Sequence, residues 1–168
     1  MTHEELAARA EITDVLMRYY RGMDRDDREL IAATFFEDAE LDYGPMYRGD
    51  LAGLLSSENR PFLTRTMHFA GNVLIELDGD DVAHTETYAI AHHTAREPHP
   101  WAGAFVVVHM RYLDRFERRD GRWAVARRHA LYEWVRKEPL DTFVEMPDEA
   151  LGRRDRQDAV YRREGASR

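Results

Sequence analysis

An aspartate and several histidines are the side chains of this chain best suited to proton transfer. Asp24 directly follows an apolar helical stripe, and His68 lies in an apolar stretch that begins a strand. Free imidazole takes up a proton at about pH 6.5, so a neutral histidine can act as a base near neutral pH. A neighbouring carboxylate would fix its tautomer and stabilise the imidazolium that forms. These residue types indicate acid–base chemistry if the fold brings them into contact.

Each of these residues also has a purely structural interpretation. Asp26 and Asp27 follow Asp24, so this turn uses aspartates in any case, and an aspartate here could cap the next helix. The C-terminal end of a helix disfavours an anion, so a buried Asp24 needs a compensating partner. A lone histidine on an apolar strand is more often a hydrogen-bonded core residue than a catalyst. His92 and His93 close one strand on opposite faces.

The sequence motifs of common cofactor chemistries are missing from this chain. It has no glycine-rich dinucleotide loop, no P-loop, no HExxH and no GxSxG in a strand-to-helix context. It has no cysteine, which excludes disulfides, thiolate nucleophiles and thiolate metal sites. No two histidines have the close spacing of metal ligands, so a metal site is the minority interpretation. We therefore expect neither a metal nor an organic cofactor.

Charge and hydropathy limit the partners that the chain could bind. Its formal net charge of −8 argues against neutralising nucleic-acid phosphates. The arginines of residues 115–128 are interleaved with acidic residues, which favours a solvated hairpin. No apolar run approaches the roughly 20 residues of a membrane-spanning helix, and the N-terminus lacks a secretory signal. We expect a cytoplasmic protein that binds neither nucleic acid nor membranes.

The elements that must position these residues are helices first and strands afterwards. Residues 4–23 carry apolar side chains at three- and four-residue intervals, and Thr2 with Glu5 predicts a capping box before this helix. Three shorter elements are expected next: a helix over 28–36, a strand over 39–43 and a helix over 50–57.

The second half of the chain is rich in β-branched and aromatic residues at alternating positions. Tight hairpins are predicted at residues 78–81 and 119–122, which makes the strands an antiparallel meander. Helices followed by strands indicate an α+β domain. Beyond Arg153 we expect a loosely held helix or a disordered tail. The predicted strands cover residues 72–77, 82–92, 105–116 and 123–134.

Four segments resemble the SnoaL-like branch of the nuclear transport factor 2-like superfamily: YYRGMDRDD (19–27), FFEDA (35–39), HFAGN (68–72) and YLDRFERRDGRW (112–123). The resemblance covers roughly residues 5–137. It implies a cone-shaped α+β fold in which N-terminal helices pack on a curved antiparallel sheet. Residues 1–140 would form the cone domain, and residues 141–168 a closing segment and tail. It also implies a homodimer or homotrimer formed through the outer face of the sheet.

Within this branch the site pattern is most similar to that of the scytalone dehydratases. That family uses an aspartate, a tyrosine and two histidines, without a cofactor, to eliminate water from a ring ketone. The resemblance places these residues at Asp24, Tyr43, His68 and His92. It implies that His68 is the base, that Asp24 orients it, that Tyr43 polarises the carbonyl, and that His92 donates to the leaving hydroxyl or holds the substrate. The Asp–His pair of the superfamily's dehydrochlorinases would also fall on Asp24 and His68.

The resemblance also suggests which residues line the pocket, and where this chain departs from the pattern. Met23 replaces a tyrosine that precedes the aspartate in the dehydratases. Met110 and Tyr112 replace a serine and an asparagine on a later strand, which predicts a different substrate. For Arg128, a structural role at the sheet surface is also open. The predicted substrate-binding set is Tyr19, Met23, Tyr47, Met110, Tyr112 and Arg128.

Two functions from different classes follow from these observations. The first is a cofactor-independent lyase or isomerase acting on a small cyclic or polyketide-like ketone. The alternative is a non-catalytic ligand-binding or assembly domain similar to the small subunits of ring-hydroxylating dioxygenases. The enzyme requires Asp24 and His68 within hydrogen-bond reach in a closed cavity. The assembly domain predicts a solvent-facing Asp24 and a cone filled by Met and Tyr side chains.

Overall fold

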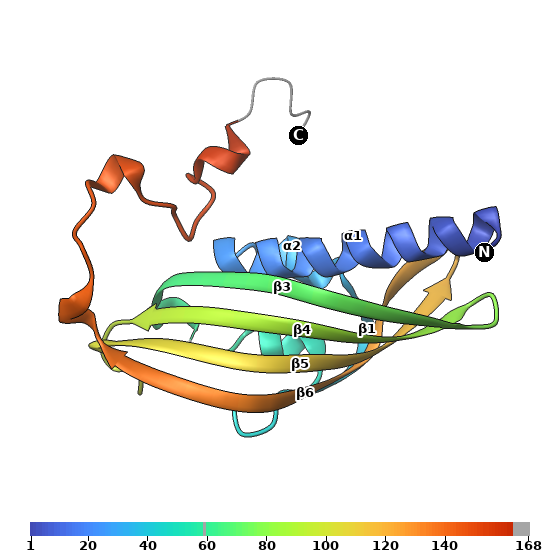
Figure 1. Ribbon diagram of the computed structural model, residues 1–168, viewed down its shortest axis with the longest axis horizontal. Helices are drawn as coiled ribbons and strands as arrows, with labels where there is room; N and C mark the ends of the chain where they lie inside the picture. The colour runs from blue at the N-terminus through green and yellow to red at the C-terminus, as the bar shows by residue number, and fades with distance from the viewer. Residues whose placement is uncertain (59, 163–168) are drawn as a thin grey trace.

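A long N-terminal helix, α1 (His3–Arg25), packs across a curved six-stranded sheet in the computed structural model of the protein (Figure 1). The structure describes residues 1–58 and 60–162. None of the helices in these residues combines the length and the apolar character that crossing a membrane requires. Besides short 3-10 helices, the structure contains α2 (Arg28–Ala32), β1 (Phe35–Asp42), β2 (Arg48–Gly49), α3 (Leu51–Leu55), β3 (Leu63–Asp78), β4 (Val82–Ala95), β5 (Ala104–Arg119) and β6 (Arg122–Pro139).

The sequence of α1 explains its start and its buried face. Thr2 accepts a hydrogen bond from the backbone of Glu5, whose side chain bonds back to Thr2, so the predicted capping box is confirmed. Gly22 allows α2 to approach closely, because a Cβ there would lie 2.7 Å from Cγ1 of Ile31. Buried residues recur at helical spacing along the sheet-facing side: Ala8, Ile12, Leu16, Tyr19 and Tyr20.

The turn after α1 uses two of its aspartates for structure and leaves the first for another role. Asp26 ends the helix in the left-handed conformation, with φ of 51°. Asp27 caps α2 by accepting the backbone N–H of Leu30 at 3.1 Å. The structural interpretation weighed for Asp24 therefore applies to its neighbours.

The four long strands form the predicted antiparallel meander, in the order β6-β5-β4-β3. The predicted hairpin turns have Gly79 and Gly121 in the left-handed region, at φ of 72° and 76°. Strand β1 pairs with β6 in parallel, so the sheet is mixed and not wholly antiparallel. Helices packed on this curved, unclosed sheet confirm the predicted α+β cone.

Strand β4 shows which face of the sheet looks toward α1. Its buried positions alternate and carry small side chains up to the last histidine, whereas the intervening residues are more exposed. Small residues on this inner face leave room for α1 and for large side chains from the neighbouring strands. The inner positions of β4 are Ala83, Thr85, Thr87, Ala89, Ala91, His93 and Ala95.

The predicted second helix is wrong at its C-terminal end. It was expected over residues 28–36, but α2 ends at Ala32 and Phe35 begins β1. The backbone N–H of Val125 donates to the carbonyl of Thr34, which joins this segment to β6. The ring of Phe35 packs edge-on against Tyr19, so its burial is achieved in a strand. The aromatic pair at 35–36 matches strand preference better than helix preference.

The C-terminal arm, residues 140–162, differs from the predicted loose tail. It leaves the end of β6 and returns to the C-terminal end of α1 (Figure 1). Arg154 and Asp158 are each 8% exposed in their side chains. Asp158 pairs with Arg25 at 3.3 Å, and Tyr161 donates a hydrogen bond to Asp27 at 2.8 Å. Charge pairs therefore anchor the arm through residue 162, and the remainder of the predicted tail, 163–168, lies outside the described residues.

Candidate active site

Asp24 and His68 meet at the junction of α1 and β3. The Nδ1 atom of His68 lies 2.6 Å from Oδ1 of Asp24, and the backbone N–H of His68 donates to both carboxylate oxygens at 3.1 and 3.0 Å. The side chains are 3% exposed for His68 and 14% exposed for Asp24. Because the carboxylate accepts at Nδ1, the neutral ring carries its proton there and presents an Nε2 lone pair. This is the geometry of an oriented general base.

A second histidine faces this pair, but it is His93 and not the predicted His92. The rings of His93 and His68 are 5.5 Å apart, and Trp101 covers His93 at 5.2 Å. Burial lowers the pKa of His93 to about 3, with the nearby His68 adding to the effect, so this ring stays neutral. Its Nδ1 is buried without a hydrogen-bond partner among the described residues.

His92 lies on the opposite, outer face of the sheet, so it does not face the Asp24–His68 pair as predicted, although it lines the outer side of the cavity that opens beside Asp24. Met67 is its partner on β3, whereas Thr66 on the inner face pairs with His93. Its Nδ1 is 3.3 Å from the carbonyl oxygen of Met67, and its ring stacks on Phe105. Matching strand starts to the family pattern placed the histidine one residue early, and one residue reverses the face of a strand.

Tyr20, part of the apolar stripe of α1, also lies beside His68, a contact that the sequence did not predict. The two ring centroids are 5.9 Å apart. Its hydroxyl is buried and has no hydrogen-bond partner among the described residues. Burial raises the pKa of Tyr20, so the hydroxyl remains a protonated donor. A buried donor without a partner is costly, which makes this position suited to a ligand oxygen or a water.

The bottom of the cone is filled by a closed polar network around Arg128. Its guanidinium donates two hydrogen bonds to Asp114, at 2.8 and 2.7 Å, and both side chains are fully buried. Tyr19 and Tyr112 cover the guanidinium at 4.1 and 4.3 Å from their ring centroids. Arg128, Tyr19 and Tyr112 were predicted to contact substrate, and here they form the floor of the cone.

Tyr43 belongs to this floor and not to the contacts of the Asp24–His68 pair. Its hydroxyl lies 2.9 Å from that of Tyr19 and 3.5 Å from Nη1 of Arg128. Burial raises the pKa of Tyr43 well above its usual range, so it stays protonated. Its hydrogen-bonding capacity is used within the floor, which argues against the predicted direct contact with a carbonyl.

The other predicted pocket residues fall in three different places. Met110 is buried on the inner face of β5. Met23 lies at the end of α1, where its sulfur accepts from Arg60 at 3.6 Å. Tyr47 is in the loop before α3 and donates to the carbonyl of Asp50 at 2.7 Å, away from the pair. The predicted substrate contacts of Met23, Met110 and Tyr47 remain predictions, and the hydroxyl of Tyr47 is already bonded to the start of α3.

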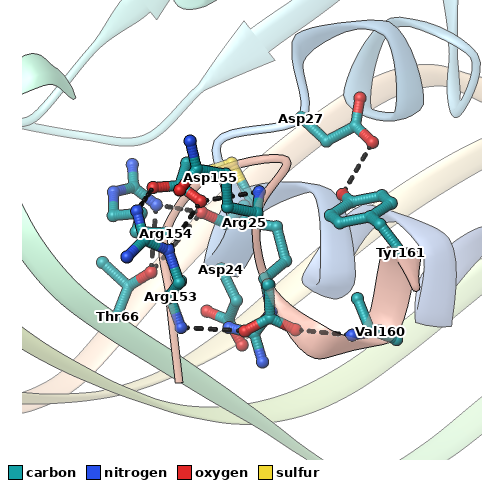
Figure 2. A network of polar contacts seen from close by, with 12 residues as sticks. Asp24, Arg25, Asp27, Thr66, Arg153, Arg154, Asp155, Val160 and Tyr161 are labelled. Atoms are coloured by element: carbon teal, nitrogen blue, oxygen red, sulfur yellow. Dashed lines mark hydrogen bonds and ion pairs between the residues drawn. The ribbon is translucent and has the colours of Figure 1, made fainter. Parts of the chain in front are cut away.

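A cavity of about 770 Å³ opens beside Asp24, between the strand ends and the C-terminal arm. Asp24, Thr66 and His93 line it on the inner side of the sheet, and Phe143 and Arg154 line it from the arm. The cavity also reaches around the strand ends to the outer face, where Met67, His92 and Phe105 line it. Figure 2 shows the arm at this place, with Arg154 beside Thr66 and close to Asp24. The cavity gives a small molecule access to the neighbourhood of the pair.

The sequence pattern could have indicated His93 and Tyr20 as site residues, but it gave no sign of Trp101 or Arg154. His93 is a histidine within the series of small inner-face residues of β4, and this alternation places it on the inner face. Tyr20 stands next to Tyr19 on the helical stripe. The contributions of Trp101 and Arg154 depend on how a loop and the arm fold back. Among the residues described, no three His, Asp or Glu side chains are grouped so that they could hold a metal ion.

The fold is the cone-shaped α+β fold of the nuclear transport factor 2-like superfamily, and the Asp24–His68 pair lies at its mouth. The chain belongs to the SnoaL-like family, whose domain model matches residues 4–129. The resemblance stated from the sequence is therefore confirmed. A comparison with curated proteins gave no match.

Solved structures with this fold include several proteins that are described as enzymes. Hexachlorocyclohexane dehydrochlorinase LinA-type3 from Novosphingobium barchaimii LL02 is 21% identical, with a TM-score of 0.71 over 86% of this chain and 97% of that one. A protein provisionally assigned as a scytalone dehydratase, from Novosphingobium aromaticivorans, is 23% identical, with a TM-score of 0.72 over 86% and 94%. A provisionally assigned aromatic ring hydroxylase from the same species is 19% identical, with a TM-score of 0.69 over 79% and 94%. These similarities establish the shared fold.

Proposed function

We propose that the protein is a cofactor-independent acid–base lyase or isomerase acting on a small cyclic ketone. The observation that carries this proposal is the 2.6 Å contact between His68 Nδ1 and Asp24 in a nearly buried position beside a cavity. An assembly domain has no need of such a pair. The enzymes named among the structures of the same fold, a dehydrochlorinase and a provisional dehydratase, support the same class.

In this proposal His68 removes a proton next to the substrate carbonyl, using Nε2. Asp24 holds the ring and stabilises the imidazolium that forms. The hydroxyl of Tyr20 and Nδ1 of His93, which have no hydrogen-bond partner in the described structure, would bind the carbonyl and the leaving hydroxyl. Because His93 stays neutral, the proton that His68 takes from carbon is the one that leaves with the hydroxyl as water. Tyr20 and His93 take the roles first expected of Tyr43 and His92. Such acid–base assistance contributes about 10²–10⁴ in rate.

The alternative of a non-catalytic binding or assembly domain also has an observation in its favour. The bottom of the cone is filled by Tyr19, Tyr43, Tyr112 and the Arg128–Asp114 pair, all of which are buried. Asp24, however, is paired and mostly buried, which that alternative does not require. The enzyme therefore remains the better explanation, with the substrate confined to the mouth of the cone.

We also propose that the outer face of the sheet mediates self-association as a homodimer or homotrimer. Exposed apolar side chains gather on it, including Met67, Phe69, Tyr88 and Trp134. Sedimentation equilibrium of the wild type and of Phe69→Glu tests this. We expect an oligomer in the wild type and a smaller species in the variant, whereas a monomeric wild type would contradict the idea.

The proposed chemistry can be tested without knowing the natural substrate. The protein is incubated in D₂O with a panel of small cyclic ketones and β-hydroxy ketones, and NMR follows deuterium uptake next to the carbonyl and loss of water. We expect the wild type to accelerate at least one member of the panel. Asp24→Asn should reduce that acceleration by about 10²–10⁴, because the ring loses its fixed tautomer and its counter-charge.

Asp114→Glu, a change at the floor of the cone, serves as the matched control and should keep most of the acceleration if it folds. Wild-type acceleration in Asp24→Asn would refute the role of the pair. If no ketone exchanges and the protein instead copurifies as a stoichiometric subunit of a larger oxygenase, the assembly domain is the correct function.

A further inference from the structure

One cation beside the candidate site comes from the C-terminal arm, outside the family match to residues 4–129. Arg154 is 8% exposed and inserts its guanidinium between the end of α1 and β3. Its Nη1 donates to the carbonyl of Met23 and, at 3.1 Å, to Oγ1 of Thr66 (Figure 2). Thr66 lies two residues before His68 on the same face of β3. The arm therefore delivers a positive charge to the mouth of the cone.

This charge is incompletely compensated by the described residues. The Nη2 atom of Arg154 is buried without a hydrogen-bond partner among them. The nearest paired carboxylate oxygen, Oδ1 of Asp26, is 3.7 Å away and already accepts from Arg60 at 2.5 Å. Asp24 is engaged by His68. Arg60 and Arg154 both lie beside the Asp26 carboxylate, and Asp24 attracts Arg154 without an ion-pair contact. Burial nevertheless lowers the pKa of Arg154 to about 10. A buried guanidinium with a free N–H favours an additional anionic acceptor.

The surroundings of Arg154 suit a flat molecule with one acidic oxygen. It lines the same cavity as Asp24 and His93. The Nδ1 atom of His93 also lacks a partner among the described residues. Phe105 and Phe143, 4.7 Å apart between their ring centroids, supply aromatic surface in this cavity. Polar groups that need a partner therefore lie next to apolar walls, as in a small-molecule site.

We propose that Arg154 binds an anionic oxygen of the substrate, so that the substrate is a small cyclic or aromatic molecule with a carboxylate or comparably acidic group. This deepens the proposed function, on which it rests, by naming the charge of the molecule that enters the same site. The guanidinium also positions the substrate relative to Asp24 and His68, because its own contacts with Met23 and Thr66 fix it in place.

Isothermal titration calorimetry with benzoate and its neutral analogue benzamide tests the charge preference. We expect the wild type to bind benzoate at least about tenfold more tightly, the size of one charge-assisted hydrogen bond. Arg154→Gln should bind the two probes nearly equally. Arg156→Gln is the matched control, since Arg156 is on the same arm, is 60% exposed and pairs with Asp27 and Glu29 outside the cavity. It should keep the preference.

Detachment of the arm is distinguished from loss of the guanidinium by a second variant. Asp158→Asn removes the partner of Arg25 and weakens the arm without changing Arg154. Hydrogen–deuterium exchange of residues 151–162 reports whether the arm remains in place in each variant. Arg154→Lys should retain part of the preference, because it keeps the charge but loses the planar fork.

The inference is overturned if the wild type binds benzoate and benzamide equally, if benzoate does not bind, or if Arg154→Gln keeps the preference. These results do not depend on turnover. Asp24→Asn, which the proposed function expects to be inactive, should still prefer benzoate. Loss of catalysis and loss of anion binding can therefore be assigned separately.

Discussion

Two carboxylate pairs lie within the same cone and differ in whether their hydrogen-bonding capacity is used up. In the Arg128–Asp114 pair, two parallel hydrogen bonds of 2.8 and 2.7 Å join side chains that are fully buried, and tyrosines cover the guanidinium. In the Asp24–His68 pair a single side-chain contact of 2.6 Å leaves the other ring nitrogen without a hydrogen bond to any described residue. Asp24 also borders a cavity.

Whether a buried charge pair can transfer a proton depends on this difference. A pair whose donors and acceptors are all satisfied, with no access to a ligand, stabilises or specifies the fold. A pair that keeps one nitrogen free beside a cavity can move a proton. The sequence contains the four residues of these pairs but does not tell the two cases apart, since the difference lies in contacts made by Tyr19, Tyr112 and the arm.

The largest expected effect separates the two pairs by stability. Asp114→Asn leaves Arg128 buried without its counter-ion and should lower the free energy of unfolding by about 3–5 kcal/mol. Asp24→Asn, the same change at the other pair, should cost only about 1 kcal/mol, because its amide oxygen can still accept the His68 N–H. Urea denaturation measures both. Similar losses in the free energy of unfolding for the two variants would contradict the distinction between the two pairs.

The next effect is the loss of folding stability at acidic pH that the buried, neutral His93 causes. Its pKa is lowered to about 3 in the folded protein, chiefly by burial, whereas an unfolded histidine takes up a proton near pH 6.5. Between these values the unfolded state binds more protons, so stability falls as the pH falls, by about 1.4 kcal/mol per pH unit from this one group.

His93→Asn should therefore show a shallower loss of stability below about pH 6.5 than the wild type. His92→Asn, on the outer face, is the control and should follow the wild-type slope. Urea unfolding at a series of pH values gives both slopes. An unchanged slope in His93→Asn would mean that this ring is protonated in the folded state and does not stay neutral beside His68.

The smallest effect compares two tyrosine hydroxyls. Tyr43→Phe removes the hydrogen bonds to Tyr19 and Arg128 and should lower stability by about 1 kcal/mol, with little change in ketone exchange. Tyr20→Phe removes a hydroxyl that has no partner in the described structure, so stability should be unchanged while exchange slows. Thermal unfolding and the exchange assay together measure this. Slower exchange in Tyr43→Phe, with unchanged exchange in Tyr20→Phe, would instead assign the polarisation of the carbonyl to Tyr43.

Much of the fold could be predicted because its signals are local. The capping box at Thr2, the helical stripe and the two hairpin turns each depend on a few neighbouring residues. The parallel pairing of β1 with β6 could not be predicted this way, since it joins residues about ninety positions apart. The same applies to the arm, whose anchoring depends on Arg154 and Asp158 meeting α1.

The candidate site was predicted where residue type and family pattern agreed. Asp24 and His68 were placed together before any distance was known. His92 was predicted because aligning strand starts leaves the face of the strand uncertain by one residue, and the register pairing of Thr66 with His93 puts His93, not His92, on the inner face. Tyr43 was expected at the substrate, but its partner Arg128 is buried under tyrosines, which spacing along the chain does not reveal.

The proton position on His68 is the most direct test of the account. Long-range ¹H–¹⁵N NMR correlations on uniformly labelled protein distinguish the two neutral tautomers of a histidine ring. At a pH where the ring is neutral, the account predicts a proton on Nδ1 and none on Nε2, with this preference lost in Asp24→Asn. A proton on Nε2, or an equal mixture in the wild type, would contradict the assignment of His68 as an oriented base.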